Sequence, residues 1–429
     1  MIRGRGSIPE LLGSATATQA LSNTVFTFAF AAPVLRGLLG WPGLIGALGA
    51  LVLVCAAVLS ARREYIEWNG LLPLTLIAFC GWTAASLLWS DYRTTTLAAI
   101  LYQLALAFAG VVVALTRDMI QLVRSVGSVL RVLLVISLLI EILAGITLDT
   151  AFPAIGVAGD LASGGPIQGI FGTRNYLGFM ASIALVTFLI ERRTRTISRS
   201  IFVASSALAL TLLVFSRSPV AWPVFLVLGI ATAVLYGLRQ ISDAAVRRSR
   251  QYVLLGALAV TALLLWLLRA PIMDLVGMRP DLDYRYGLWQ TTMRATELAP
   301  VEGWGWAGTW TSQQPFSTIN TFVGVEHDSA LNAFVDVALQ LGYVGAALFA
   351  VLVITAVGRS WLLASNRRNV TFTWPALMLI VMLATSAAES YLLVEGGWLL
   401  LVVCTVRAAQ SHSWRGRLRT TPLPAPPLE

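Results

Sequence analysis

Long apolar segments, separated by short connections that carry arginine, constrain this chain more than any other feature. Of its 429 residues, 57% are hydrophobic and only 12% are charged, whereas soluble domains carry about 25% charged residues. A helix needs roughly 20 apolar residues to cross a bilayer, which predicts an all-α, polytopic membrane bundle of about twelve spans. The predicted spans are residues 17–35, 40–60, 70–90, 95–116, 128–147, 175–190, 200–216, 219–237, 252–269, 342–358, 372–392 and 394–408.

The distribution of arginine predicts how the bundle is oriented. All 30 basic residues are Arg; with both termini in the cytoplasm, 22 of them fall on the inner side and 8 on the outer side. Cytoplasmic connections of membrane proteins are the more basic ones. The net charge of +9 is therefore attributed to arginines in the cytoplasmic connections, and nucleic acid is not expected as a partner. We predict one membrane-embedded domain, residues 1–410, and a disordered cytoplasmic tail, residues 411–429.

One predicted outer connection is much longer than the others. Residues 270–341 are rich in Trp, Gly, Pro and acidic residues. The segment from His327 to Leu341 places apolar residues at three- and four-residue steps, which predicts an amphipathic helix, with Asp328 or Ser329 as its N-cap. A second outer connection, residues 148–174, is polar and rich in Gly.

Three arginines on the predicted outer side are candidates for binding a phosphate-bearing group. Arg174 precedes a span, Arg217 lies in a short Ser-Arg-Ser-Pro turn, and Arg285 lies between two tyrosines in the long loop. The planar guanidinium binds phosphate through two parallel hydrogen bonds and keeps its charge. The alternative is that each side chain extends to lipid headgroups or pairs with a nearby acid.

His327 is a candidate general base, because it is the only histidine outside the C-terminal tail. It could equally hydrogen-bond a diphosphate oxygen or be an ordinary residue near a helix cap. Glu326 and Asp328 beside it are alternative bases. Asp281 and Asp283 form an Asp-x-Asp pattern that is only weak evidence for a metal site. Acids at the outer ends of spans, including Glu389, mark a functional cavity or simply balance the arginines.

Several short motifs, taken in order, resemble the O-antigen ligase and polymerase superfamily of bacterial membrane glycan transferases. The resemblance covers about residues 70–358. Its pieces are Ser86-Leu87-Leu88-Trp89-Ser90, Arg174-Asn175-Tyr176-Leu177-Gly178, Ser216-Arg217-Ser218, Arg285 with Trp289, Gly303-Trp304-Gly305, His327-Asp328, and Leu341-Gly342 with Gly345. Two positions depart from the family pattern: Asp328 follows the key His, and Arg174 precedes the Asn-Tyr pair.

The resemblance implies a specific activity. A glycan would be transferred, with inversion and without a metal ion or other cofactor, from a polyprenyl diphosphate carrier to a hydroxyl of a glycan or glycolipid acceptor. His327, Arg217 and Arg285 would be catalytic. Substrate would also be bound by Arg174, Asn175, Tyr176, Trp289, Glu326 and Asp328.

The implied site is the outer face of the bacterial cytoplasmic membrane, and three alternatives stay open. A polymerase of the same superfamily would use the same chemistry. A transporter or flippase of a lipid-linked glycan would be expected to show two similar halves, which the sequence does not indicate. A non-catalytic scaffold of an envelope complex would leave the outer arginines unexplained. Trp304, Trp306 and Trp310 would stack on sugars or anchor the chain at the interface.

Overall fold

The computed structural model describes residues 13–65, 73–276 and 279–411, and all regular structure in these ranges is helical. The α-helices are α2 (Ala15–Phe30), α3 (Ala32–Ala61), α4 (Leu74–Ala85), α5 (Arg93–Thr116), α6 (Met119–Ile142), α7 (Arg174–Arg193), α8 (Arg199–Phe215), α9 (Ala221–Arg239), α10 (Ala244–Leu267), α11 (Arg269–Val276), α12 (Arg279–Thr296), α13 (Phe316–Val323), α14 (Ala333–Asn366), α15 (Thr373–Ser386) and α16 (Glu395–Ser411). Short 3-10 or π turns are η1 (Arg63–Tyr65), η2 (Ser86–Leu88), η3 (Leu143–Leu148), η4 (Pro153–Ile155), η5 (Gly169–Phe171), η6 (Val370–Phe372) and η7 (Tyr391–Leu393).

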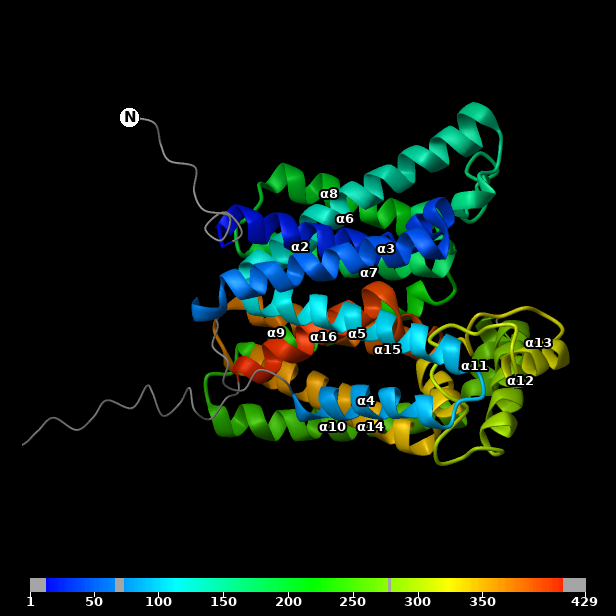
Figure 1. Ribbon diagram of the computed structural model, residues 1–429. Coiled ribbons are helices and arrows are strands. Elements are labelled where there is room, and N and C mark those ends of the chain that lie inside the picture. Colours follow the sequence, from blue (N-terminus) through cyan, green and yellow to red (C-terminus); the bar gives the residue numbers. More distant parts are fainter. Residues whose placement is uncertain (1–12, 66–72, 277–278, 412–429) are drawn as a thin grey trace, which may run out of the picture.

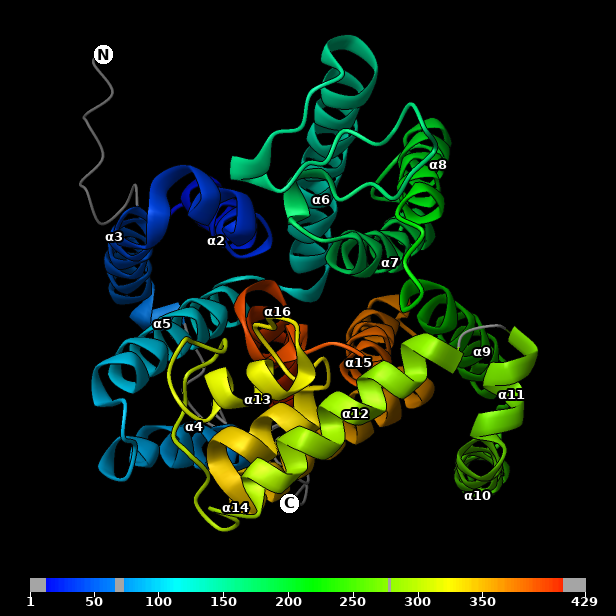
Figure 2. The same cartoon turned by 90° about the vertical axis from the view of Figure 1, so that its right-hand side faces the viewer.

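The long helices run side by side along one axis, so the bundle has two distinct ends (Figure 1). The helices α11, α12 and α13 gather at one of them, which we call the cap end. Figure 2 looks onto this end and shows α12 lying across the bundle axis. We call the opposite end the base end. There Arg117 donates to the carbonyl of Ala15 at the start of α2, and Arg407 of α16 donates to the carbonyl of Ala114. The helix α2 therefore begins, and α16 ends, at the base end.

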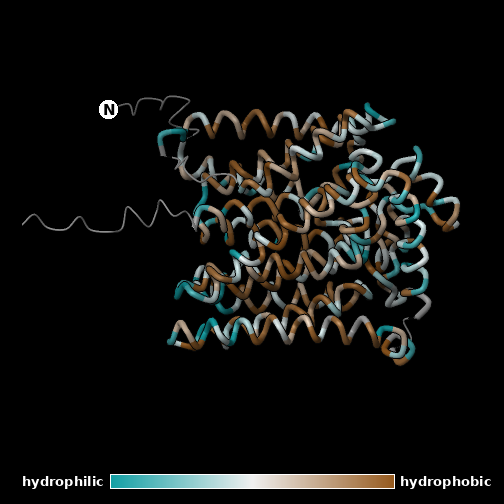
Figure 3. Tube along the Cα trace, turned by 90° about the horizontal axis from the view of Figure 1, so that it is seen from below, coloured by the Kyte–Doolittle hydropathy of each residue, from teal (hydrophilic) through white to brown (hydrophobic). Residues whose placement is uncertain are grey.

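The core is formed around α7 and α16, and the periphery is apolar. Nearly every residue of α7 between Tyr176 and Glu191 is buried, as is α16 from Trp398 to Cys404. On α10, by contrast, Leu255, Leu258 and Leu263 are each more than half exposed. Figure 3 shows apolar residues along the helices and polar ones gathered toward both ends. Apolar side chains facing outward are expected where the surroundings are lipid.

Five helices among the described residues are long and apolar enough to cross a membrane. They are Ala32–Ala61, Arg93–Thr116, Met119–Leu148, Ala221–Arg239 and Ala333–Asn366. Three shorter apolar helices, Leu74–Leu88, Arg199–Phe215 and Val370–Ser386, accompany them. The prediction of an all-helical membrane bundle is therefore confirmed at this level, and the number of spans stays a prediction. Each predicted span contains a helix, but several run past its ends: the predicted span 372–392 includes residues 387–390, which are not helical.

The predicted boundary between the first two spans differs from the observed one. The helix α2 already ends at Phe30, and α3 starts at Ala32 and kinks at Gly40, whose φ is 66°. Pro42 follows the kink, and because it has no backbone N–H it cannot complete the helical hydrogen bonding there. The predicted disordered tail lies outside the described residues, except for Ser411 at the end of α16.

The helix predicted from His327 to Leu341 starts later than expected. Leu331 has a φ of 52°, which is not helical, and the side chain of Asn332 accepts hydrogen bonds from the N–H groups of Phe334 and Val335. Asn332 is thus the N-cap, in place of Asp328 or Ser329. The helix does not end at residue 341 either, because α14 continues through a kink at Gly342 as far as Asn366.

Candidate functional site

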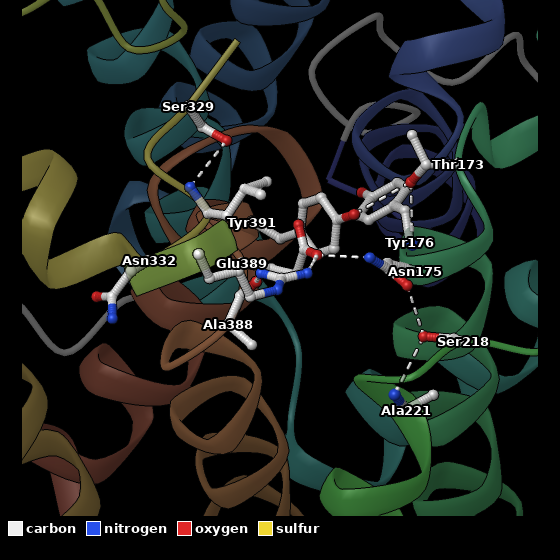
Figure 4. Close-up of polar contacts among 12 residues, drawn as sticks. Thr173, Asn175, Tyr176, Ser218, Ala221, Ser329, Asn332, Ala388, Glu389 and Tyr391 are labelled. Atoms are coloured by element: carbon white, nitrogen blue, oxygen red, sulfur yellow. Dashed lines mark hydrogen bonds and ion pairs between the residues drawn. The ribbon is translucent and has the colours of Figure 1, made fainter. Parts of the chain in front are cut away.

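A buried carboxylate at the cap end joins three segments that are far apart in the sequence. Glu389, in the connection between α15 and α16, is only 3% exposed. Its Oε1 accepts a hydrogen bond of 2.6 Å from Nδ2 of Asn175 and is paired at 3.4 Å with Arg285 on α12. The other guanidinium nitrogen of Arg285 donates to the carbonyl of Ala388 at 2.5 Å. We call this arrangement the Glu389 centre; Figure 4 shows Glu389 and Asn175 in contact.

Asn175 extends the centre to the Ser-Arg-Ser turn between α8 and α9. Its Oδ1 accepts a 2.7 Å hydrogen bond from the hydroxyl of Ser218, and Oγ of Ser218 accepts from the N–H of Ala221 (Figure 4). Asn175 is placed by the N-cap of α7, where Thr173 accepts from the N–H of Tyr176. Close approach of α7 and α9 requires Gly178, because a Cβ there would lie 2.6 Å from Cβ of Ala221.

Arg174 and Arg217 adjoin, in the sequence, the two residues that this hydrogen bond joins. Both arginines are exposed. Neither side chain has a hydrogen-bond or ion-pair partner in the described part of the chain. Arg217 has a φ of 45°, a left-handed conformation that is uncommon for residues other than glycine. The turn therefore holds Arg217 in a strained position with its charge uncompensated, which is typical of a binding site.

His327 belongs to the same end of the molecule through α12. Its Nε2 is hydrogen-bonded to the hydroxyl of Tyr284, the residue before Arg285. The side chain of Asn320 holds the backbone of His327 from both sides, accepting from its N–H and donating to its carbonyl. The pKa of His327 is lowered from 6.5 mainly by partial burial; Asp328 raises it and Arg285 lowers it further. His327 is accordingly neutral at physiological pH, as a general base must be.

A second buried acid, Asp336 in α14, ties the segments of the cap end together. Its carboxylate accepts from Nε1 of Trp310 at 2.6 Å, from the N–H of Ala330 at 3.0 Å, and from the hydroxyl of Ser390. Ser390 directly follows Glu389, so Asp336 fixes the connection that carries the Glu389 centre. The carboxylate is fully buried, and its contacts are structural.

The tryptophan-rich motifs of the long loop pack it onto the bundle. Nε1 of Trp289 donates to the carbonyl of Ala330, and that of Trp304 donates to the carbonyl of Ala295. Gly305 donates its N–H to the carbonyl of Gln340. The positive φ of Gly342 brings it so close to Val301 that a Cβ would lie 2.1 Å from the carbonyl oxygen there.

The motif Ser86–Ser90 joins this same junction. Oγ of Ser86 accepts from the N–H of Trp306, and Nε1 of Trp89 donates to the carbonyl of Glu302. Three of the motifs singled out in the sequence, around residues 86–90, 303–305 and 341–342, thus meet in space. Their common effect is to hold the long loop against the helices.

The structure relates the predicted site residues to the Glu389 centre in different ways. Arg285 and Asn175 bind Glu389, Arg174 and Arg217 adjoin Asn175 and Ser218 in the sequence, and His327 is hydrogen-bonded to Tyr284 beside Arg285. Tyr176 is only 4% exposed and packs its ring 4.8 Å from that of Tyr391. Glu326 and Asp328 are exposed beside His327. The side chain of Asp281 lies outside the described residues, and no group of three potential metal ligands occurs in the ranges searched.

Sequence reasoning missed most of the residues that organise the site. Glu389 was expected only to mark a cavity or to balance the arginines, Ser218 was named only as part of the Ser-Arg-Ser motif, and Tyr284, Asp336 and Ser390 were given no role. For Asp336 a signal existed, because an acid inside an otherwise apolar helix is rare and marks a buried polar contact.

Comparisons with known proteins give no family for this chain. No family model matches it, and no curated protein matches its sequence. Its function is therefore inferred from the residues and geometry of the cap end.

Proposed function

We propose that this protein is an O-antigen ligase-like glycosyltransferase of the bacterial cytoplasmic membrane, with its cap end on the outer face. It would transfer a glycan from a polyprenyl diphosphate carrier to a hydroxyl of a glycan or glycolipid acceptor. One observation carries the proposal above the rest: the buried carboxylate of Glu389 binds both Arg285 and Asn175, the exposed Arg174 and Arg217 adjoin Asn175 and its partner Ser218 in the sequence, and Tyr284 beside Arg285 is hydrogen-bonded to His327.

In the proposed reaction the arginines bind the leaving group. Arg174 and Arg217 are exposed and have no partner among the described residues, so they are available to the diphosphate oxygens, and Arg285 is held at the same end of the bundle by Glu389 and Ala388. As the acceptor oxygen attacks the anomeric carbon, the bond from that carbon to the diphosphate oxygen breaks. Negative charge then develops on the diphosphate, and fixed guanidinium groups stabilise it without reorganising.

His327 is assigned the role of general base. In the proposed tautomer the ring proton is on Nδ1, so Nε2 accepts the hydrogen bond of the Tyr284 hydroxyl and can accept a proton. An acceptor hydroxyl that replaced Tyr284 at Nε2 would be deprotonated as it attacks. The proton thus passes from acceptor to His327, the glycan to the acceptor oxygen, and both bonding electrons to the diphosphate. Charge stabilisation by arginine alone makes the proposed reaction independent of metal ions.

The experiment that tests this function uses the full chain in proteoliposomes with an undecaprenyl diphosphate-linked glycan. We expect release of undecaprenyl diphosphate together with elongation of the acceptor, and equal rates with and without EDTA. Translocation of the intact donor without release of the diphosphate would identify a transporter instead. Loss of activity in EDTA, restored by a divalent cation, would contradict the metal-independent mechanism.

A glycan profile of a deletion strain then separates the two transferase activities, which share the same chemistry. Accumulation of carrier-linked long chains identifies a ligase, and loss of long chains identifies a polymerase.

The proposed orientation is tested by cysteine labelling in a variant that lacks Cys55, Cys80 and Cys404. Gln313 at the cap end and Ser249 near the start of α10 are both exposed. In intact cells an impermeant thiol reagent should label Cys at position 313 and not at position 249. The reverse pattern would place the Glu389 centre in the cytoplasm and contradict the proposed function.

A further inference from the structure

A cavity of about 370 Å³ opens at the cap end, apart from the Glu389 centre. It lies between α3, α5, the start of α16 and residues 306–311 of the long loop. Figure 2 shows these helices as neighbours when the cap end is viewed face on. Its volume falls within the range of small-molecule binding sites, roughly 300–1,000 Å³.

Buried polar atoms without partners line this cavity. Both side-chain atoms of Gln103, the hydroxyl of Tyr102 and Nε1 of Trp306 have no hydrogen-bond partner among the described residues. Gln103 is 3% exposed and Trp306 is 1% exposed. An unsatisfied buried polar group costs about 1–3 kcal/mol, so four such atoms in one cavity are unexpected unless a ligand completes them.

The backbone around these side chains is fixed. Trp398 donates to the carbonyl of Gln103 at 3.0 Å, and the N–H of Trp306 donates to Oγ of Ser86 at 3.1 Å. The backbone of Gln103 and of Trp306 is therefore held in position, while their buried side-chain polar atoms have no partner among the described residues. Such preorganisation is what a binding site requires.

The walls of the cavity are aromatic and its charges cancel. Trp41, Tyr102, Trp310 and Trp398 all line it. Arg36 lies over the ring of Trp41, 5.1 Å from its centre, and forms a 2.6 Å ion pair with Glu395. Because the two charges neutralise each other, the cavity is suited to an uncharged ligand, in contrast to the exposed arginines beside the Glu389 centre.

We propose that this cavity binds a neutral sugar ring. The apolar face of a pyranose packs on aromatic side chains, and its hydroxyl groups both donate and accept hydrogen bonds. The Gln103 amide can satisfy a pair of such hydroxyls, while Trp306 donates to an oxygen. A lipid acyl chain would fill the volume and leave all four polar atoms unsatisfied. The choice of a sugar among hydroxylated rings rests on the proposed function.

The position of the cavity links it to the Glu389 centre. The connection from α15 to α16 contributes Glu389 to the centre and Leu393, Val394 and Glu395 to the cavity. A sugar bound there would lie beside the same short segment that holds the diphosphate-binding arginine. Either the donor glycan or the acceptor glycan has the required chemistry.

Binding is measured with the full chain in nanodiscs by saturation-transfer NMR. The probes are the methyl glycosides of glucose, galactose, mannose, rhamnose and N-acetylglucosamine. We expect saturation transfer to at least one of them, and a fall of at least about tenfold in its affinity in Gln103→Leu and in Trp306→Phe, because each variant removes hydrogen bonds to the sugar. Exposed Gln290 and Trp222 supply the matched controls, Gln290→Leu and Trp222→Phe, which should bind as the wild type does.

Thermal stability separates this role from a structural one. Gln103→Leu replaces an unsatisfied polar side chain by an apolar one of similar size, so the variant should be as stable as the wild type or more stable. Retained stability with lost binding supports the proposal. Transfer to none of the five glycosides, or equal binding by wild type and Gln103→Leu, would overturn it.

Two further measurements show whether the bound sugar belongs to the donor or to the acceptor, and they test this proposal separately from the proposed function. Arg285→Lys should keep sugar binding, because its side chain does not line the cavity, even where transfer is lost. In the transfer assay, a higher KM of Gln103→Leu for the acceptor assigns the ring to the acceptor, and a higher KM for the donor assigns it to the donor. An unchanged KM for both would overturn the proposal while leaving the proposed function intact.

Discussion

Two of the arginine–glutamate pairs among the described residues, one toward each end of the bundle, differ in geometry. In the base half, Arg131 of α6 meets Glu191 of α7 with two parallel hydrogen bonds of 2.6 and 3.0 Å. Its guanidinium also lies 5.2 Å from the ring centre of Phe188. At the cap end, Arg285 reaches Glu389 through a single 3.4 Å contact, and its other nitrogen is bound to a backbone carbonyl.

The difference indicates that the Arg131–Glu191 pair stabilises the fold, whereas the Arg285–Glu389 pair can bind a ligand. The Arg131–Glu191 pair has both carboxylate oxygens engaged by one guanidinium, and packing around it is tight. A Cβ at Gly127 would lie 2.6 Å from the Glu191 carboxyl carbon. The Glu389 carboxylate instead shares one oxygen between Asn175 and Arg285, from different segments. Arg285 is therefore positioned by one short hydrogen bond to the Ala388 carbonyl and one 3.4 Å contact with Glu389, and it can exchange the longer contact for a phosphate oxygen.

The largest expected effect is the loss of transfer when His327 is changed. His327→Ala should lower kcat by about 10²–10⁴-fold, the usual contribution of a general base, with little change in stability because the side chain is only half buried. Activity of wild type should rise with pH through a pKa below 6.5 and be level at neutral pH, because the neutral imidazole is the active form.

The His327→Gln variant distinguishes two roles of His327, general base and hydrogen-bond partner of the diphosphate. Gln keeps hydrogen bonding but does not accept a proton at neutral pH. Strong residual activity in Gln and none in Ala would assign His327 to diphosphate binding, and full activity in Ala would remove it from the site.

Conservative substitution of the two paired arginines should sharpen the comparison most directly. We expect Arg285→Lys to lower kcat/KM by about 10²–10³-fold, because a point charge does not reproduce the guanidinium contacts to a developing oxyanion. The matched variant Arg131→Lys should transfer glycan at the wild-type rate per folded molecule. Rates are measured at equal amounts of purified protein; similar losses in both variants would show that the two pairs do not differ in function. Arg217→Lys should behave as Arg285→Lys does.

Truncation of the arginine in the base half is expected to affect stability instead of activity. Arg131→Ala leaves Glu191, which is 1% exposed, without its charged partner. Breaking a buried pair in this way destabilises by about 3 kcal/mol or more, which chemical unfolding in detergent will measure. An unaltered unfolding midpoint would contradict the structural role assigned to the Arg131–Glu191 pair.

The smallest predicted effect concerns Ser218, which orients Asn175 without facing the substrate in our proposal. Ser218→Ala removes a 2.7 Å hydrogen bond and leaves Oδ1 of Asn175 unsatisfied, so kcat/KM should fall by about tenfold, equivalent to ~1.4 kcal/mol. Ser386→Ala is the control, because that hydroxyl is bonded within its own helix. A loss as large as that of Arg285→Lys would mean that Ser218 itself contacts the substrate.

The helices were predictable because apolar length and helix-forming caps are local properties. Each predicted span could be located without knowing its neighbours, although the span predicted at 128–147 begins well inside α6, which starts at Met119 after a capping box of Asp118 and Gln121. Boundaries were less certain. The kink at Gly40 and the cap at Asn332 depend on which of several possible residues the packed chain uses.

The arginines of the site were also found from the sequence, because charge is conspicuous in an apolar chain. What the sequence did not reveal is which acid accompanies each arginine. Glu389 is more than 100 residues from Arg285, and no periodicity relates the two. Likewise the unsatisfied Gln103, in the middle of the apolar helix α5, becomes noticeable only once Trp306 and Glu395 are placed around it.

The sequence by itself determined that the helices are suited to a lipid bilayer, that the fold is helical, and that arginine is in surplus. These properties follow from composition and from hydropathy summed over neighbouring residues. Tertiary structure alone decided that Arg131 forms two hydrogen bonds with Glu191, while Arg217 is exposed and has no hydrogen-bond or ion-pair partner in the described part of the chain. The physical reason is that a buried charge is compensated by groups brought close in space, and the helices supply these from positions that the chain order leaves far apart.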